Sequence, residues 1–224
     1  MQSKYLKIIN VFIFLVLTTP LFSQTGTPPF WDEIQNFKKE DNIKYPAKDQ
    51  ILFVGSSSFK MWANIEKYFP GFKIINRGFG GSSLQDVIQY ADDIIFPYHP
   101  KQIVIYCGEN DLAASDTVNA QLVLSRFKKL FLLIRSRLLK VPVVFISIKP
   151  SPSRQHFMPK MAAANQLIKK FLKTQKRTAF VDVYHKMLSA NGQPMNDIFL
   201  ADKLHMNAKG YAIWAKLIKP SLIK

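Results

Sequence analysis

Ile51-Leu52-Phe53-Val54-Gly55-Ser56-Ser57-Ser58 joins four apolar residues to a glycine and three serines. The apolar residues predict a buried strand, and the residues that follow, 59–65, predict a helix. A strand that ends in Gly-x-Ser and turns directly into a helix places a serine hydroxyl at the edge of a parallel sheet. The helix N-terminus adds unpaired N–H groups and the positive end of a dipole, which suits a nucleophile beside a developing anion. Serine is also a preferred N-cap residue, so this stretch alone is compatible with a structural role.

Further strand-like and helix-like segments alternate along the rest of the chain. Strands are expected at 72–76, 101–106, 143–148 and 179–183, and helices at 84–91, 117–140, 159–174 and 207–219. The nearly continuous apolar segment 143–148 is typical of a strand covered on both faces. Alternating strands and helices predict an α/β fold whose parallel sheet carries helices on both faces. In such a sheet the functional site lies beyond the carboxyl ends of the strands.

The N-terminal part of the chain has the pattern of a targeting segment. Lys4 and Lys7 precede an apolar run at 8–17. This pattern predicts a secretory signal peptide over residues 1–23, and residues 24–224 are then expected to form one domain, periplasmic or secreted. The run is short for a membrane span, so no stable membrane anchor is expected after cleavage. An uncleaved N-terminal anchor is the alternative. Beyond this segment, a short amphipathic piece at 30–37 predicts a helix that acts as a lid or a wrap.

The chain is strongly basic, with a formal net charge of +16. The first 23 residues contain two lysines and no acidic residue, so +14 remains without them. Such a charge favours anionic partners such as polysaccharides or phospholipid headgroups, but a solvated basic surface without a specific partner is the favoured alternative. The lysines are spread along the chain without interleaved aromatic residues, so no nucleic-acid partner is expected. The single cysteine, Cys107, permits no intrachain disulfide and is expected to be buried.

Polar or glycine-rich stretches follow several of the expected strands and should meet at one edge of the sheet. They are Gly55-Ser56-Ser57, the glycines Gly78, Gly80 and Gly81, Gly108-Glu109-Asn110-Asp111, and Asp202-Lys203-Leu204-His205. Each stretch alone is a weak signal. Together they supply a serine nucleophile, a histidine base with an orienting carboxylate, and donors for an oxyanion, which are the groups that acyl transfer requires.

These stretches resemble the sequence blocks of the SGNH hydrolases, the esterase superfamily also called GDSL-like. The resemblance covers about residues 50–215, with the blocks in the family's order. It implies five site residues: the nucleophile Ser57, the oxyanion donors Gly81 (backbone N–H) and Asn110 (side-chain amide), and the remaining pair Asp202 and His205. It also implies a flavodoxin-like three-layer α/β/α fold with about five parallel strands. The implied activity is hydrolysis of carboxylic esters without a metal or cofactor.

Two positions depart from the family pattern, and some assignments have rivals. Ser56 stands where the family name expects Asp, and Ser82 stands where the subgroup resembling platelet-activating-factor acetylhydrolase usually has Asp. The second departure weakens any transfer of that subgroup's substrate. Ser56 or Ser58 could cap the helix while Ser57 reacts. Asp182 rivals Asp202 as the orienting carboxylate. Other histidines have other expected places: His156 and His185 near the pocket, and His99 on the surface.

The function expected from the sequence is that of an exported serine esterase. It would remove short acyl groups such as acetyl from a small-molecule, glycan or lipid ester through an acyl-serine intermediate. One alternative is an acyltransferase that uses the same site and passes the acyl group to a sugar hydroxyl. Another is a non-catalytic module that binds anionic glycan or lipid, against which the complete set of five site residues argues. The sequence leaves hydrolase and transferase, the acyl chain, the alcohol and the oligomeric state open.

Overall fold

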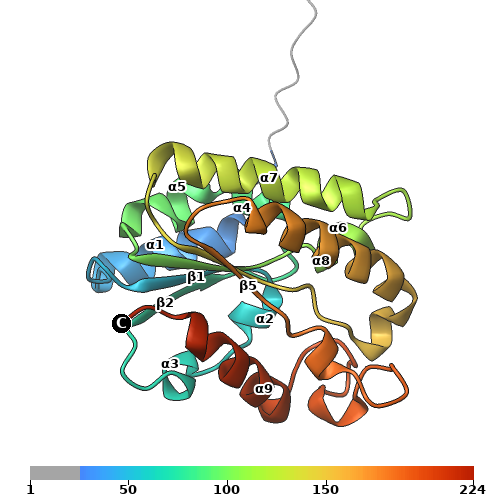
Figure 1. The fold of residues 1–224 in the computed structure, drawn as a ribbon. Coiled ribbons are helices and arrows are strands. Elements are labelled where there is room, and N and C mark those ends of the chain that lie inside the picture. Colours follow the sequence, from blue (N-terminus) through green and yellow to red (C-terminus); the bar gives the residue numbers. More distant parts are fainter. Residues whose placement is uncertain (1–25) are drawn as a thin grey trace, which may run out of the picture.

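A five-stranded parallel sheet forms the centre of the computed structural model, which describes residues 26–224 (Figure 1). The predicted signal peptide at 1–23 lies outside the described residues. The sheet has the order β2-β1-β3-β4-β5. The strands are β1 (Ile51–Gly55), β2 (Ile74–Gly78), β3 (Gln102–Tyr106), β4 (Val143–Ile146) and β5 (Thr178–Val181). This order confirms the flavodoxin-like three-layer fold.

Helices cover both faces of the sheet (Figure 1). One face carries α1 (Trp31–Ile43), α4 (Leu84–Gln89), α5 (Ala91–Ile94), α6 (Glu109–Ala113), α7 (Ala120–Arg137) and α8 (Met158–Lys173). The other carries α2 (Ser57–Lys60), α3 (Ile65–Tyr68) and α9 (Ala208–Ile218). Short 3-10 helices lie at η1 (Phe96–Tyr98), η2 (Pro152–Phe157), η3 (His185–Met187), η4 (Asn196–Ile198) and η5 (Lys219–Ser221).

The strands divide their side chains between two apolar cores. Leu52 and Val54 of β1 join the core beneath α7 and α8, while Ile51 and Phe53 join the core that α9 covers. Successive residues of a strand point to opposite faces, so each strand contributes to both layers. Burial on both faces explains why these strands are continuously apolar rather than alternating. Cys107 is fully buried, as predicted.

The helix predicted at 59–65 is the main error in the expected elements. The chain forms the short helix α2, turns, and starts α3 at Ile65. Asn64 adopts a left-handed conformation (φ 50°), through which a right-handed helix does not continue. The turn buries Trp62, whose ring stacks on Tyr211 of α9 with the ring centroids 4.8 Å apart. A contact with a distant helix therefore overrides the local helical pattern.

Strand β2 lies two residues later than predicted. It extends through Gly78, which pairs with Gly55 in the sheet. A Cβ atom at Gly78 would lie 2.5 Å from the Cβ of Phe59, so the close approach of α2 to β2 requires glycine there. The predicted long helix at 117–140 is confirmed as α7, and the Asn119 side chain caps it by accepting from Leu122 N–H at 2.9 Å.

Helix α1 wraps one face of the fold and confirms the helix predicted at 30–37. The carbonyl of Pro29 accepts a hydrogen bond from the Tyr90 hydroxyl at 2.6 Å, and Asp41 pairs with the buried Arg77 at the other end of the helix. The Arg77 guanidinium also lies 5.0 Å from the centroid of the Phe37 ring. Among residues 26–224, none of the helices has the length and apolar character that a membrane crossing demands.

Candidate active site

Ser57, His205 and Asp202 form one hydrogen-bonded path at the carboxyl edge of the sheet. Ser57 is the first residue of α2, and Ser56 alone separates it from the end of β1. Its Oγ lies 3.0 Å from His205 Nε2, and His205 Nδ1 lies 2.6 Å from Asp202 Oδ2. Since a carboxylate accepts from Nδ1–H, Nε2 is left as an acceptor for the serine hydroxyl. The predicted nucleophile, base and carboxylate are therefore brought together in this order.

The loop between η4 and α9 fixes the Asp–His pair. Asp202 Oδ1 accepts from the backbone N–H groups of Leu204 and His205, both at 2.9 Å. Lys203 between them takes a left-handed conformation (φ 58°), which closes the turn. Partial burial raises the pKa of the Asp202 carboxyl, but the hydrogen bonds from His205 and Leu204 outweigh it and lower the pKa to about 2. Asp202 is thus an anion at neutral pH and holds the imidazole in one orientation.

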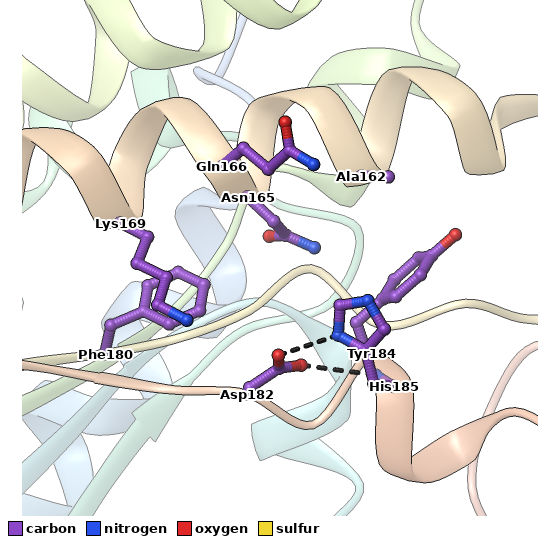
Figure 2. A pocket seen from close by; sticks show the side chains of 8 residues that line it. All are labelled: Ala162, Asn165, Gln166, Lys169, Phe180, Asp182, Tyr184 and His185. Carbon is purple, nitrogen blue, oxygen red and sulfur yellow. Dashed lines mark hydrogen bonds and ion pairs between the residues drawn. The ribbon is translucent and has the colours of Figure 1, made fainter.

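A second Asp–His pair lies at the end of β5 (Figure 2). His185 Nδ1 lies 2.7 Å from Asp182 Oδ2, and Asp182 Oδ1 accepts from His185 N–H at 3.2 Å. Asp182 therefore orients His185, while the carboxylate that contacts His205 belongs to Asp202. The pair lines a pocket of about 230 Å³ between α8 and the segment from Phe180 to His185. Ser57 and His205 do not line this pocket.

Ser57 is the only one of the three adjacent serines whose hydroxyl contacts His205 in the described part of the chain. Ser56 occupies the N-cap position of α2, but its side chain makes no capping hydrogen bond, and Ser58 lies inside the helix, so neither serine is the side-chain cap that the sequence allowed. Both flanking serines are buried. The residue before the three serines must be glycine, because a Cβ atom at Gly55 would lie 1.9 Å from the carbonyl oxygen of Tyr106.

Three loops at this edge are tied together through main-chain carbonyls. The Gly55 carbonyl accepts from Phe79 N–H at 2.9 Å and from the Ser82 hydroxyl at 3.1 Å. The Ser82 carbonyl accepts in turn from Asn110 Nδ2 at 3.0 Å. The loops after β1, β2 and β3 are therefore linked in series. Ser82, at the position where a related subgroup has Asp, is fully buried and supports this linkage.

Two backbone N–H groups and one hydrogen of a side-chain amide have no partner within residues 26–224. The backbone N–H groups of Ser57 and Gly81 donate to no other group in this range, and Asn110 Nδ2 uses one of its two hydrogens for Ser82. Gly81 has a positive φ of 74°, which glycine adopts without strain. Unpaired N–H groups on tied loops beside a serine hydroxyl are suited to bind an oxyanion.

Comparison with known proteins identifies the family of this chain. A model of the GDSL-like lipase/acylhydrolase family matches residues 54–213, which is more than half of the chain. The chain belongs to this family. The resemblance of the sequence blocks to that superfamily is thereby confirmed. No curated protein sequence matches the chain.

Solved structures share the family fold at low sequence identity. A GDSL-like lipase from Bacteroides thetaiotaomicron VPI-5482 is 22% identical with a TM-score of 0.70, covering 84% of this chain and 96% of that chain. A protein from Streptococcus pneumonia is 20% identical with a TM-score of 0.74, covering 86% and 92%. An acetylxylan esterase from Geobacillus stearothermophilus is 12% identical with a TM-score of 0.63, covering 79% and 95%. At these identities the likeness shows the fold.

A buried charged cluster next to Asn110 was not predicted from the sequence. Glu109 lies between two cations: its carboxylate is 3.0 Å from Lys149 Nζ and 3.3 Å from Arg154 Nη1. The Tyr106 hydroxyl donates to Glu109 Oε2 at 2.6 Å. Arg154 Nη1 also donates to Asn110 Oδ1 at 2.9 Å. The sequence signal for this cluster is the presence of Lys149 and Arg154 after the apolar segment 143–148. Such residues are also common in ordinary loops, so a local pattern does not identify the cluster.

Burial and charge oppose each other within this cluster. Burial raises the pKa of the Glu109 carboxyl, but Lys149 and Arg154 outweigh it, so its pKa is lowered. Burial also lowers the pKa of the Lys149 ammonium, which Glu109 partly offsets. The described part of the chain contains no group of three His, Cys, Asp or Glu side chains arranged to hold a metal ion.

Proposed function

We propose that this family member is an exported serine esterase that cleaves carboxylic esters through an acyl-serine intermediate. The observation that carries the proposal is the hydrogen-bonded path from Ser57 through His205 to Asp202. A serine hydroxyl is a weak nucleophile unless an adjacent base accepts its proton, and this path supplies the base and its orienting anion.

The proposed reaction has two halves. Ser57 Oγ attacks the ester carbonyl carbon while His205 Nε2 takes its proton. The resulting oxyanion lies against the Gly81 N–H and the Asn110 amide, and the N–H groups at the start of α2 add to the field. His205 then returns the proton to the leaving alcohol, which leaves Ser57 acylated. In the second half, water activated by His205 releases the acid and restores the serine.

Short acyl groups such as acetyl, carried on a carbohydrate or lipid, are the proposed substrates. Support comes from the acetylxylan esterase among the structures with the same fold and from the net charge of +14 that remains without the first 23 residues, which favours polyanionic material. The same site would also serve an acyltransferase, because a sugar hydroxyl can replace water in the second half.

A panel of nitrophenyl esters with acyl chains of increasing length tests this proposal. The purified protein is expected to show a burst of nitrophenol followed by steady turnover, with kcat/KM highest for acetyl. A soluble sugar alcohol added to the reaction separates hydrolysis from transfer, because a transferase would form the acetylated sugar instead of acetate. Absence of turnover together with tight binding to an anionic glycan would favour the binding-module alternative.

Export is proposed on the basis of residues 1–23. Cleavage after this segment is expected to produce a mature chain that begins near Gln24, recovered outside the cytoplasm. N-terminal sequencing of the protein from cell fractions measures this directly. A protein recovered with Met1 from the membrane fraction would instead match the uncleaved anchor.

A further inference from the structure

The Asn110 amide is held at both ends by groups that permit only one orientation. Its nitrogen donates to the Ser82 carbonyl at 3.0 Å, and its oxygen accepts from Arg154 Nη1 at 2.9 Å. A carbonyl oxygen is only an acceptor and a guanidinium is only a donor. If the amide were flipped, its oxygen would face the Ser82 carbonyl oxygen and its nitrogen would face Arg154 Nη1, and neither pair could form a hydrogen bond. Arg154 and Ser82 therefore determine which atom of Asn110 can face a bound oxyanion.

Arg154 is itself held in place by two different contacts. Its Nη1 pairs with Glu109, the residue before Asn110, and its side chain is only 20% exposed. The neighbouring Ser153 donates both its N–H and its hydroxyl to the Lys203 carbonyl, at 3.1 and 3.0 Å. Lys203 lies between Asp202 and His205. The η2 segment that carries Arg154 thus contacts both the oxyanion side and the histidine side of the site.

The cluster behind Asn110 places a guanidinium on the oxygen side of the amide. Glu109 is one anion between two cations, Lys149 and Arg154, and the Lys149 side chain is fully buried. Buried ion pairs contribute little net stability compared with apolar packing, so stability alone does not account for this cluster. A positive charge on the oxygen side of an amide polarises its N–H bonds and strengthens them as donors.

We propose that Arg154 is a positioning residue, which orients and polarises the Asn110 amide so that its second N–H serves a developing oxyanion. This inference rests on the proposed function, in which Asn110 is an oxyanion donor. Arg154 acts through Asn110 and does not need to touch the substrate. Glu109, which is also paired with Lys149, holds the Arg154 guanidinium beside the amide oxygen.

Replacement of Arg154 by methionine tests this role through the kinetics of nitrophenyl acetate hydrolysis. Asn110→Ala is expected to lower kcat by about 10²–10³-fold, the range for one lost oxyanion donor. Arg154→Met is expected to lower kcat by about 10- to 100-fold with KM nearly unchanged, because the donor remains but is less well held. Arg154→Lys keeps a charge and a donor and should recover part of this loss.

The double variant distinguishes positioning from a general structural effect. If Arg154 acts through Asn110, Arg154→Met should cost almost nothing further in the Asn110→Ala background. Arg126→Met is the matched control. Arg126 lies in α7 with its side chain 18% exposed, and it pairs with Asp111, which follows Asn110 in α6. Within the described residues it makes no hydrogen bond to the Asn110 amide. That control is expected to lower the melting temperature while kcat, measured where the protein is folded, changes less than about threefold.

Two results would overturn the proposal. One is an unchanged kcat in Arg154→Met, which together with a raised KM would make Arg154 a substrate-binding group. The other is an undiminished loss in the Asn110→Ala background. Folding of Arg154→Met is checked by thermal melting, and Glu109 keeps Lys149 and Tyr106 as partners in this variant. Labelling of Ser57 by a serine phosphonate in the wild type tests the proposed serine esterase function independently of the role of Arg154. A wild type with neither labelling nor turnover overturns the proposed function and this inference with it.

Discussion

Ser57→Ala is expected to lower kcat by about 10⁶-fold and to abolish covalent labelling by a serine phosphonate. The reason is that the Ser57 hydroxyl lies 3.0 Å from His205 Nε2, so its loss removes the nucleophile while His205 and Asp202 remain paired. Labelling followed by peptide mapping, together with single-turnover kinetics on nitrophenyl acetate, measures both effects. The fold should persist, because alanine at the first position of α2 removes no capping hydrogen bond.

The flanking serines provide the matched controls for this experiment. Ser56→Ala and Ser58→Ala each remove a buried hydroxyl within one residue of Ser57, and neither hydroxyl contacts His205 in the described structure. Both variants should keep the label on the peptide that contains Ser57. A label that survives Ser57→Ala but is lost in one of the neighbouring variants would assign the nucleophile to that neighbour.

Asp202→Asn is expected to lower kcat by about 10⁴-fold with little change in structure. The carboxylate, whose pKa is lowered to about 2, accepts from His205 Nδ1–H and leaves Nε2 as the base. An asparagine amide can donate to Nδ1 instead, which places the proton on Nε2 and removes its capacity to accept from Ser57. Steady-state kinetics at pH 7 to 8 gives the size of the loss.

Asp182→Asn is the natural control because the chain contains the same local pair twice. Asp182 and His185 have the same spacing and the same two contacts as Asp202 and His205, but His185 does not contact Ser57 within residues 26–224. This variant should leave kcat within about twofold, as for a surface change away from the site. A large loss in Asp182→Asn, with Asp202→Asn near wild type, would reverse the assignment of the orienting carboxylate.

The order of strands and helices could be predicted because its signal is local. Apolar runs such as 143–148 and the helical spacing of α7 are readable in short windows, and the parallel topology then places Ser57, Asn110 and His205 at one edge. Within the site, the pairing of Ser57 with His205 could be expected because the sequence resembles the family's blocks, and the two side chains are in contact. Their catalytic roles stay predictions until the variants are measured.

The features that were missed depend on contacts between distant parts of the chain. The helix predicted at 59–65 breaks because Trp62 packs on Tyr211, which no local window contains. Arg154 has the sequence surroundings of an ordinary loop residue, and its place beside Glu109 and Asn110 appears only once β3 and β4 are adjacent. Side-chain capping by Ser56 failed for a related reason, since capping requires geometry and not only a preferred residue type.

The carbonyls of Gly55 and Ser82 give this chain a particular freedom to diverge. Their oxygens tie the three loops together, and of these ties the one from Phe79 N–H to Gly55 uses main-chain atoms alone. The side chain at position 56 takes no part in these ties and can change without loss of them, whereas position 82 needs a side chain that donates to the Gly55 carbonyl. A family member whose loops are tied through main-chain atoms can differ from its relatives in the residues of the motif and still hold its oxyanion donors in the same positions.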